Sequence, residues 1–120
     1  TTLARWFTPS FRVHSSQHVA ALRDIVVAND PKNYAIHRQI LAEGVTELIR
    51  PTPPLKQPSL IMTCQNDSGS TPAMSQAIAE EIMGSELNIL PKLQHLGLLE
   101  DPKAFADPLL AFLRIKLPPR

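Results

Sequence analysis

The stretch that decides the fold is LIMTCQNDSG, residues 60–69. Its first five residues form a short apolar run without polar alternation, which is typical of a strand buried on both faces in a parallel sheet. Its last five residues have the composition of a turn. A helix is expected next, because Ser70 or Thr71 can cap its N-terminus and Pro72 suits its first turn.

A second strand follows this predicted helix. Met74, Ile78 and Ile82 have the spacing of the buried stripe of a helix that ends at Gly84. LNIL, residues 87–90, is a second short apolar run. Two strands separated by a helix are expected to pair in parallel, with the helix as their crossover.

The end of the chain predicts one more helix, which begins at Asp101 and Pro102. Its apolar residues recur at helical spacing as far as Leu113. Pro108 lies inside that pattern, and a proline lacks the N–H and clashes with the preceding turn. We therefore expect a kink or a break at Pro108. The second half of the sequence thus alternates strand, helix, strand and helix, which predicts an α/β fold.

The first half of the sequence predicts helices without strands. One apolar stripe indicates a helix over 17–28, and a second helix is expected from Pro31 with Gly44 just after its end. Residues 51–58 hold four of the 12 prolines and must be extended, since proline breaks helices. We divide the chain into a helical segment (1–50), a proline-rich linker (51–58) and an α/β part (59–120).

The composition excludes several classes of protein. The 120 residues carry 12 Lys and Arg against 11 Asp and Glu, without a basic stripe, so no nucleic-acid partner is expected. The apolar runs are far below the ~18–20 residues that span a bilayer, and no signal-peptide pattern is visible. The single cysteine, Cys64, excludes an intrachain disulfide. We expect a cytoplasmic protein without membrane contact.

Asp67 and His95 are the candidate catalytic residues. Each follows a predicted strand by a few residues, and in open α/β sheets the working site lies beyond the carboxyl ends of the strands. A carboxylate beside an imidazole holds one tautomer and stabilises the imidazolium, so such a histidine can act as a general base. The sequence contains no G-x-S-x-G motif, so a nucleophile for this pair is missing.

Other reactive groups have simpler explanations. His14 and His18 are four residues apart, as in some metal sites, but neither a third ligand nor a catalytic glutamate accompanies them. Cys64 is expected to be an inert, buried strand residue. Thr1 could act as an N-terminal nucleophile, but no strand is predicted after it. We expect no metal and no cofactor.

The residues around the Asp67 and His95 pair resemble the C-terminal half of the α/β-hydrolase superfamily. PSLIM, Asp67 and TPAM, all within 58–74, are similar to the stretch in which the penultimate strand delivers the triad acid. QHL and EDP, within 94–105, resemble the histidine loop and the start of the last helix. The resemblance implies that Asp67 is the triad acid and His95 the triad base.

The first segment resembles the cap of the 3-oxoadipate enol-lactonase-like hydrolases. The resemblance rests on RWFTPSF at 5–11 and NYA at 33–35. It implies a small-molecule ester or lactone substrate, or cleavage of a carbon–carbon bond. Trp6 and Arg5 are candidate substrate-binding residues, because a cap pocket uses aromatic walls and arginine can hold a carboxylate.

The resemblance also implies the organisation of the whole chain. Residues 1–50 would be a helical cap segment, and 59–120 the C-terminal part of an α/β core with two parallel strand–helix units. Cys64 and Gln94 stand where the family usually has glycine, and larger side chains there can tilt the two loops. The missing nucleophile and the missing initiator methionine together predict a fragment of a longer enzyme.

The expected partner is the N-terminal half of the hydrolase, which would carry the nucleophile, or a second copy in a swapped homo-oligomer. Two strands and their helices leave a sheet edge and apolar faces uncovered, so we expect stability only in such an assembly. The alternative function is a non-catalytic interaction module with the same fold. The alternative fold is a helical domain, which the short runs at 60–64 and 87–90 oppose.

Overall fold

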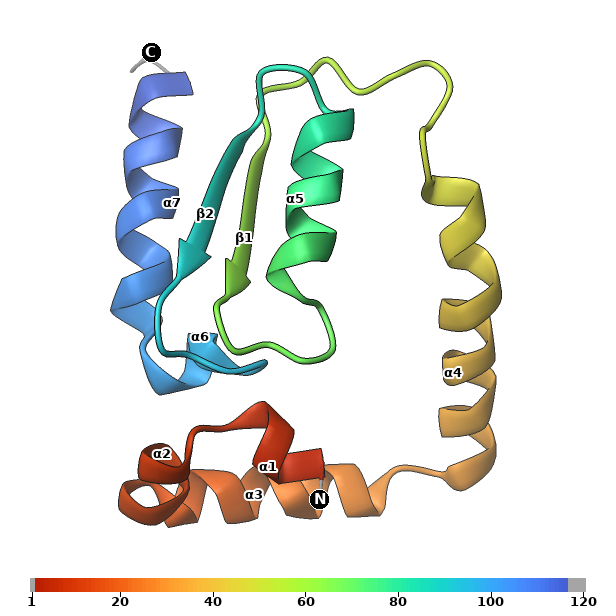
Figure 1. The fold of residues 1–120 in the computed structure, drawn as a ribbon. Coiled ribbons are helices and arrows are strands. Elements are labelled where there is room, and N and C mark those ends of the chain that lie inside the picture. Colours follow the sequence, from red (N-terminus) through yellow and green to blue (C-terminus); the bar gives the residue numbers. More distant parts are fainter. Residues whose placement is uncertain (1, 117–120) are drawn as a thin grey trace.

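The computed structural model describes residues 2–116 (Figure 1). At its centre lie two parallel strands, β1 (Leu60–Cys64) and β2 (Glu86–Leu90). Leu60 pairs with Glu86 and Cys64 pairs with Leu90, so both strands end at the same level. The predicted parallel pair is confirmed. The alternative of a helical domain is wrong, because both apolar runs are strands.

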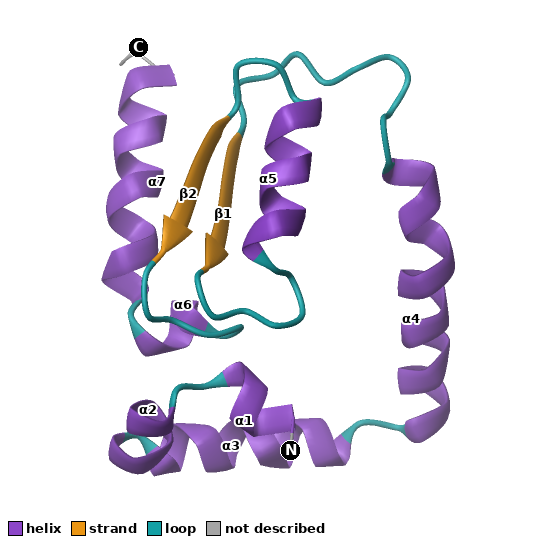
Figure 2. Cartoon of the chain, viewed as in Figure 1, coloured by secondary structure: helices purple, strands orange, loops and turns teal. Residues whose placement is uncertain are grey.

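A helix flanks each side of the two strands, as Figure 2 shows. α5 (Pro72–Glu81) joins β1 to β2, and α7 (Pro102–Lys116) follows the short α6 (Gly97–Glu100). Thr71 is the N-cap of α5, since its hydroxyl accepts a hydrogen bond from the N–H of Met74. The crossover helix therefore begins where its capping residues predict.

α7 continues through Pro108 as one helix, so a break there is wrong, while the kink that the sequence also allows stays a prediction. Pro108 removes the hydrogen bond that an N–H at this position would donate to the carbonyl of Ala104, one turn earlier. α7 contacts β2, and Phe112 on this helix is buried. Packing of this apolar face holds the two parts of the helix together despite the missing hydrogen bond.

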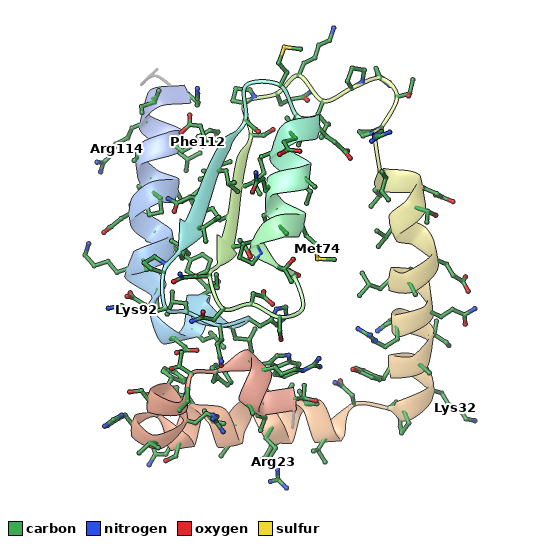
Figure 3. The ribbon with its side chains drawn as sticks, viewed as in Figure 1. Arg23, Lys32, Met74, Lys92, Phe112 and Arg114 are labelled. Carbon is green, nitrogen blue, oxygen red and sulfur yellow. The ribbon has the colours of Figure 1, made fainter. Side chains whose placement is uncertain are left out.

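The predicted buried stripe of α5 is largely exposed, contrary to the expectation from its spacing. Met74 is 57% exposed and Ile78 is 48% exposed, while the buried residue of α5 is Ser75. Figure 3 shows Met74 pointing away from the strands, whereas Phe112 lies between α7 and β2. Two strands cover one narrow face of α5, so the rest of its apolar surface stays open within the described chain.

The strands themselves are buried only in part. In β1, Thr63 and Cys64 at the carboxyl end are buried, and the three preceding residues are half-buried. In β2, Leu87 and Ile89 remain exposed, and only Leu90 is buried. The expectation of burial on both faces therefore holds at the carboxyl end of the sheet, next to the loops that follow the two strands.

The first segment is helical, as predicted. Asp30 begins one of its helices as an N-cap by accepting a hydrogen bond from the N–H of Asn33. Gly44 does not terminate that helix in a left-handed conformation, because its φ of −75° continues the chain into a 3-10 turn. The elements are α1 (Thr2–Trp6), α2 (Pro9–His14), α3 (Ser16–Ala28), α4 (Pro31–Gly44) and the 3-10 turn η1 (Val45–Leu48).

The helical segment wraps around the carboxyl ends of the two strands (Figure 1). α1 and α2 lie next to α6, α3 runs across below them, and α4 rises on the side of α5. Residues 49–59 lead back to β1 without a helix or strand. The N–H of Arg50 in this connection donates to Glu81 of α5 at 3.1 Å. The edge at which both strands end therefore faces the helical segment.

Candidate active site

Asp67 and His95 meet at the carboxyl edge of the sheet. Asp67 lies three residues after β1, and His95 lies five residues after β2. The backbone joins the two loops, because the N–H of Asn66 donates to the carbonyl of Leu93 at 3.0 Å. Nδ1 of His95 lies 2.8 Å from Oδ2 of Asp67. The equal level of the strand ends thus brings the two side chains into direct contact.

The Asp67 carboxylate is buried and accepts hydrogen bonds on both oxygens. Oδ1 accepts the N–H of Gly69 at 2.7 Å and the N–H of Ser70 at 2.9 Å, while Oδ2 contacts His95. Burial acts to raise the pKa of Asp67, but the hydrogen bonds from His95, Ser70 and Gly69 outweigh it and hold the pKa below its usual value. Asp67 is therefore ionised at neutral pH.

The neighbouring carboxylate decides which nitrogen of His95 carries the proton. An ionised carboxylate only accepts hydrogen bonds, so Nδ1 of His95 must be the donor in this contact. In the neutral ring, the free lone pair then lies on Nε2. The His95 side chain is 37% exposed and lines a pocket. The ring can accept a proton at Nε2 from a group bound in that pocket.

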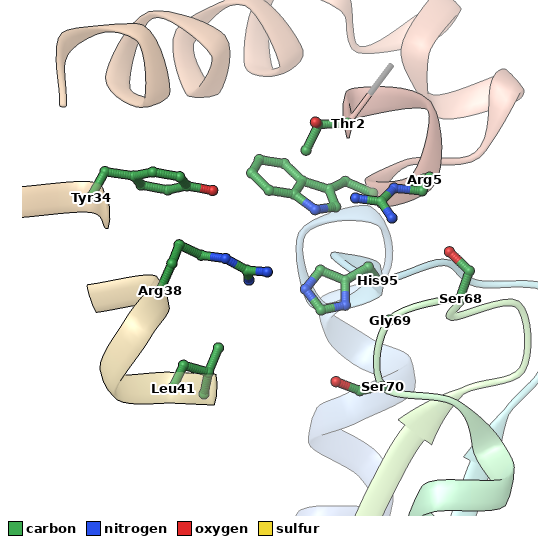
Figure 4. A pocket seen from close by; sticks show the side chains of 10 residues that line it. Thr2, Arg5, Tyr34, Arg38, Leu41, Ser68, Gly69, Ser70 and His95 are labelled. Atoms are coloured by element: carbon green, nitrogen blue, oxygen red, sulfur yellow. The ribbon is translucent and has the colours of Figure 1, made fainter. Parts of the chain in front are cut away.

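The pocket beside His95 has a volume of about 450 Å³. It lies between the carboxyl edge of the sheet and the helical segment, and Figure 4 shows it from close by. Its walls include Arg5 of α1, Arg38 of α4 and Ser70 of the Asp67 loop. A space of this size accommodates a small organic molecule.

Trp6 and Arg5, the two predicted substrate-binding residues, both line this pocket. The rings of Trp6 and His95 are stacked, with centroids 6.4 Å apart and an interplanar angle of 30°. Figure 4 shows the guanidinium group of Arg5 beside His95 and that of Arg38 extending toward it from α4. The pocket thus combines an aromatic wall with two cations next to the imidazole.

Sequence reasoning missed the contribution of α4 to this pocket. Tyr34, Arg38 and Leu41 all line it, and their spacing of i, i+4 and i+7 places them on one face of the helix. The signal was present in the sequence, since an arginine between an aromatic and an aliphatic residue on one face is unusual for a core stripe. The residues that face α4 across the pocket, however, lie far from it along the chain.

Neither the thiol of Cys64 nor any hydroxyl group is placed to serve as a nucleophile for His95 in the described part of the chain. Among residues 2–116, His95 makes no hydrogen bond to a hydroxyl or thiol, and its hydrogen bond goes to Asp67. Cys64 is 3% exposed, and burial raises the pKa of its thiol, which disfavours the reactive thiolate. Thr1, the candidate N-terminal nucleophile, lies outside the described residues.

The two positions that depart from the family pattern leave the acid–base pair intact. The side chain of Cys64 lies against Gly97, where an added Cβ would come within 2.5 Å of Sγ. Gly97 therefore provides the space that the thiol occupies. Oε1 of Gln94 is buried without a hydrogen-bond partner in the described structure. The expected tilt of the loops does not separate Asp67 from His95, which remain 2.8 Å apart.

The other histidines considered from the sequence lie elsewhere. Nδ1 of His14 contacts the backbone carbonyl of Ser10 at 2.9 Å, and His18 lies on α3. Within the part of the chain that the structure describes, no group of three His, Cys, Asp or Glu side chains could hold a metal ion. None of the helices in that part is long and apolar enough to cross a lipid bilayer.

Comparison with known proteins adds one informative similarity. No protein-family model and no curated protein matches the sequence. The fold is similar to the crystal structure of the enol-lactonase from Burkholderia xenovorans LB400, with a TM-score of 0.83 and 28% sequence identity. The similarity covers 93% of this chain and 42% of that enzyme, so the chain spans less than half of its length. The chain therefore folds as the C-terminal portion of an α/β-hydrolase and resembles an enol-lactonase.

Proposed function

We propose that this chain supplies the acid and the base of a serine-type α/β-hydrolase that cleaves an ester or lactone bond. The observation that carries the proposal is the 2.8 Å contact between His95 Nδ1 and the buried Asp67 carboxylate, beside a pocket. An oriented carboxylate–imidazole pair is the part of a catalytic triad that moves protons. The similarity to an enol-lactonase supports this class of reaction.

His95 acts first as a general base and then as a general acid. Nε2 takes the proton of a serine hydroxyl while the serine Oγ forms a bond to the carbonyl carbon of the substrate. The bond from that carbon to the leaving oxygen then breaks, and Nε2 returns the proton to the leaving oxygen. A water molecule repeats both steps on the acyl-enzyme and releases the acid. Asp67 stays ionised and stabilises the imidazolium.

In this proposal, the serine and the oxyanion-hole donors come from the N-terminal half of the hydrolase or from a second copy in a swapped homo-oligomer. Open apolar surface in the α/β part supports such a partner. Met74 and Ile78 of α5, and Leu87 and Ile89 of β2, are all more than a third exposed. Unpaired strand edges and open apolar faces favour association with another sheet or subunit.

Trp6 and Arg5 would bind the substrate in the pocket next to His95. Trp6 offers a flat apolar wall, and Arg5 offers a cation for a polar or anionic part of the substrate. Cleavage of a carbon–carbon bond next to a carbonyl is the alternative reaction at the same site. Neither reaction needs a cofactor. The cytoplasmic location expected from the sequence stays a prediction.

A non-catalytic interaction module with the same fold is the second candidate. The observation in its favour is that, among residues 2–116, no hydroxyl or thiol is hydrogen bonded to His95. Such a module would keep the Asp67 and His95 contact as a tie between two loops. In such a module, the free lone pair on Nε2 would take no part in proton transfer.

Hydrolysis of p-nitrophenyl acetate separates the two candidates. The chain is combined with its N-terminal complement, and we expect turnover by the mixture but not by either part alone. His95→Ala should abolish this turnover, because no base remains to activate the serine. His37→Ala is the matched control, since His37 is an exposed histidine on α4. Equal turnover with His95→Ala would reject His95 as the base, and an inactive mixture would favour the module.

A further inference from the structure

Three consecutive residues, 6–8, attach the turn between α1 and α2 to the rest of the structure. The carbonyl of Trp6 accepts a hydrogen bond from the N–H of Leu96 at 2.9 Å. Phe7 is 1% exposed and is the largest fully buried side chain of the described residues. Thr8 is bound to Glu100 through two hydrogen bonds. These contacts fix the turn to the α/β part.

The Glu100 carboxylate receives both polar hydrogens of Thr8. Oε1 accepts the backbone N–H at 2.8 Å, and Oε2 accepts the hydroxyl at 2.6 Å, although the two residues are 92 positions apart in sequence. Hydrogen bonds to an ionised carboxylate are shorter and stronger than neutral ones. The Thr8 hydroxyl also accepts the N–H of Phe11 as the N-cap of α2. Glu100 thus fixes the point at which α2 begins.

Glu100 and His95 belong to the same short region of the α/β part. Glu100 is the last residue of α6, which starts two residues after His95. Trp6 lies across from this region, with its ring stacked on the imidazole. Figure 1 shows α6 facing α1 and α2 at this junction. The bonds at Trp6 and Thr8 therefore tie the aromatic wall of the pocket to the loop that carries the proposed base.

We infer that Glu100 is a positioning residue: through Thr8 it holds the Trp6 ring against His95 and so sets the wall of the pocket. Without the Glu100 carboxylate, the turn between α1 and α2 keeps the hydrogen bond from Leu96 to Trp6 but loses the two hydrogen bonds at Thr8. The indole can then swing away from the imidazole. The role in substrate binding rests on the proposed function, whereas the geometric claim rests on these contacts alone.

Fluorescence of Trp6 provides a direct test on the chain assembled with its N-terminal complement. Trp6 is the single tryptophan of the chain, and tryptophans of the complement are replaced by phenylalanine so that the emission belongs to Trp6. A protonated imidazole next to an indole quenches its emission, so the emission should be lower in an acidic buffer than in a neutral one. The other charged groups that face His95 are Asp67, Arg5 and Arg38. His95→Gln should remove the change and so assign it to His95.

Glu100→Ala should reduce this pH-dependent change about twofold or more, because it removes both hydrogen-bond acceptors of Thr8 and the rings interact only at centroid distances of about 4.5–7 Å. Glu47→Ala is the matched control, since Glu47 is an exposed glutamate on η1. It should retain the full change. A folded Glu100→Ala chain with an unchanged pH response would overturn the inference, and circular dichroism establishes that it is folded.

Substitutions of Thr8 provide a second test in case Glu100→Ala does not fold. Thr8→Val removes the hydroxyl donor while Glu100 and the backbone N–H remain, so the pH response should fall in part. Thr8→Ser keeps both donors and should restore the response. A full response in Thr8→Val would contradict a role for this contact. Because emission is measured without substrate, failure here is distinct from failure of the hydrolase proposal, which only the ester assay tests.

Discussion

Two helices of similar length show how differently the two halves of the chain are supported. α7 has 15 residues and buries Phe112, whereas α4 has 14 residues and buries none of them. Ile40 in the middle of α4 is 62% exposed. Helices in proteins derive most of their stability from the packing of an apolar face. Within the described chain, α7 has that support and α4 lacks it.

The same contrast divides the proposed active site. The proposed acid and base, Asp67 and His95, lie on loops that leave the sheet and are hydrogen bonded to each other. The opposite wall of the pocket comes from α4 through Tyr34 and Arg38. We therefore expect the proposed proton-transfer groups to be firmly placed and the wall formed by α4 to be adjustable.

The largest expected effect concerns catalysis in the α/β part. Asp67→Asn should lower kcat of the assembled hydrolase by about 10⁴-fold, because an amide fails to hold the catalytic tautomer of His95. Trp6→Ala in the cap segment should instead raise KM about tenfold with little change in kcat, as expected for the loss of a binding contact. Steady-state kinetics with p-nitrophenyl acetate distinguish the two outcomes. A wild-type kcat in Asp67→Asn would remove Asp67 from the mechanism.

The next effect concerns the two helices directly. Phe112→Ala should lower the free energy of unfolding by about 3–5 kcal/mol, because it leaves a cavity between α7 and β2. Ile40→Ala on α4 should change it by less than about 0.5 kcal/mol, as for other exposed positions. Urea denaturation followed by circular dichroism measures both. Equal losses would show that α4 is packed in solution and would abolish the contrast.

Two glycine substitutions test how closely the backbone is packed in each half of the chain. Gly97→Ala should destabilise the chain by about 1–3 kcal/mol, the usual cost of overpacking, since the new methyl group would meet Cys64 Sγ at 2.5 Å. Gly44→Ala should stabilise it by about 0.4–1 kcal/mol, because nothing lies within 4 Å and φ is −75°. Thermal unfolding of both variants should shift in opposite directions. Shifts in the same direction would contradict the close approach at Gly97.

The smallest effect is the pH dependence of stability. The pKa of Asp67 is lower in the folded chain than its ordinary value of 3.8. This group therefore stabilises the fold above that value, and the contribution disappears as the pH falls through the lower, folded pKa. The wild-type chain should lose unfolding free energy more steeply below about pH 4 than Asp67→Asn, which has no carboxyl group to protonate. Urea denaturation at a series of pH values measures the two slopes, and parallel slopes would argue against the lowered pKa of Asp67.

Local signals were sufficient for the elements around the site. The apolar runs at 60–64 and 87–90 predicted both strands, and Thr71 marked a helix start through its capping side chain. The meeting of Asp67 with a histidine 28 positions away followed from topology. Parallel strands have their carboxyl ends at one edge, so residues just after them become neighbours.

The features that sequence reasoning missed depend on long-range packing. Helical spacing indicated that Met74 and Ile78 form an apolar face, but it did not indicate what covers that face. Pro108 has a poor helix propensity that packing of α7 overrides. Glu100 and Thr8 carry no local sign of their contact, since each is an ordinary polar residue in its own segment.

The tautomer of His95 tests the central claim most directly, because Asp67 can serve as triad acid only if it fixes the proton on Nδ1. Nitrogen-15 NMR of the chain labelled at histidine, at a pH where the ring is neutral, distinguishes the two ring nitrogens. We predict a protonated Nδ1 whose proton is strongly shifted by the Asp67 carboxylate, together with an unprotonated Nε2. Loss of this pattern in Asp67→Asn would assign it to the pair. A protonated Nε2, or a rapid mixture of both tautomers in the unmodified chain, would contradict the account.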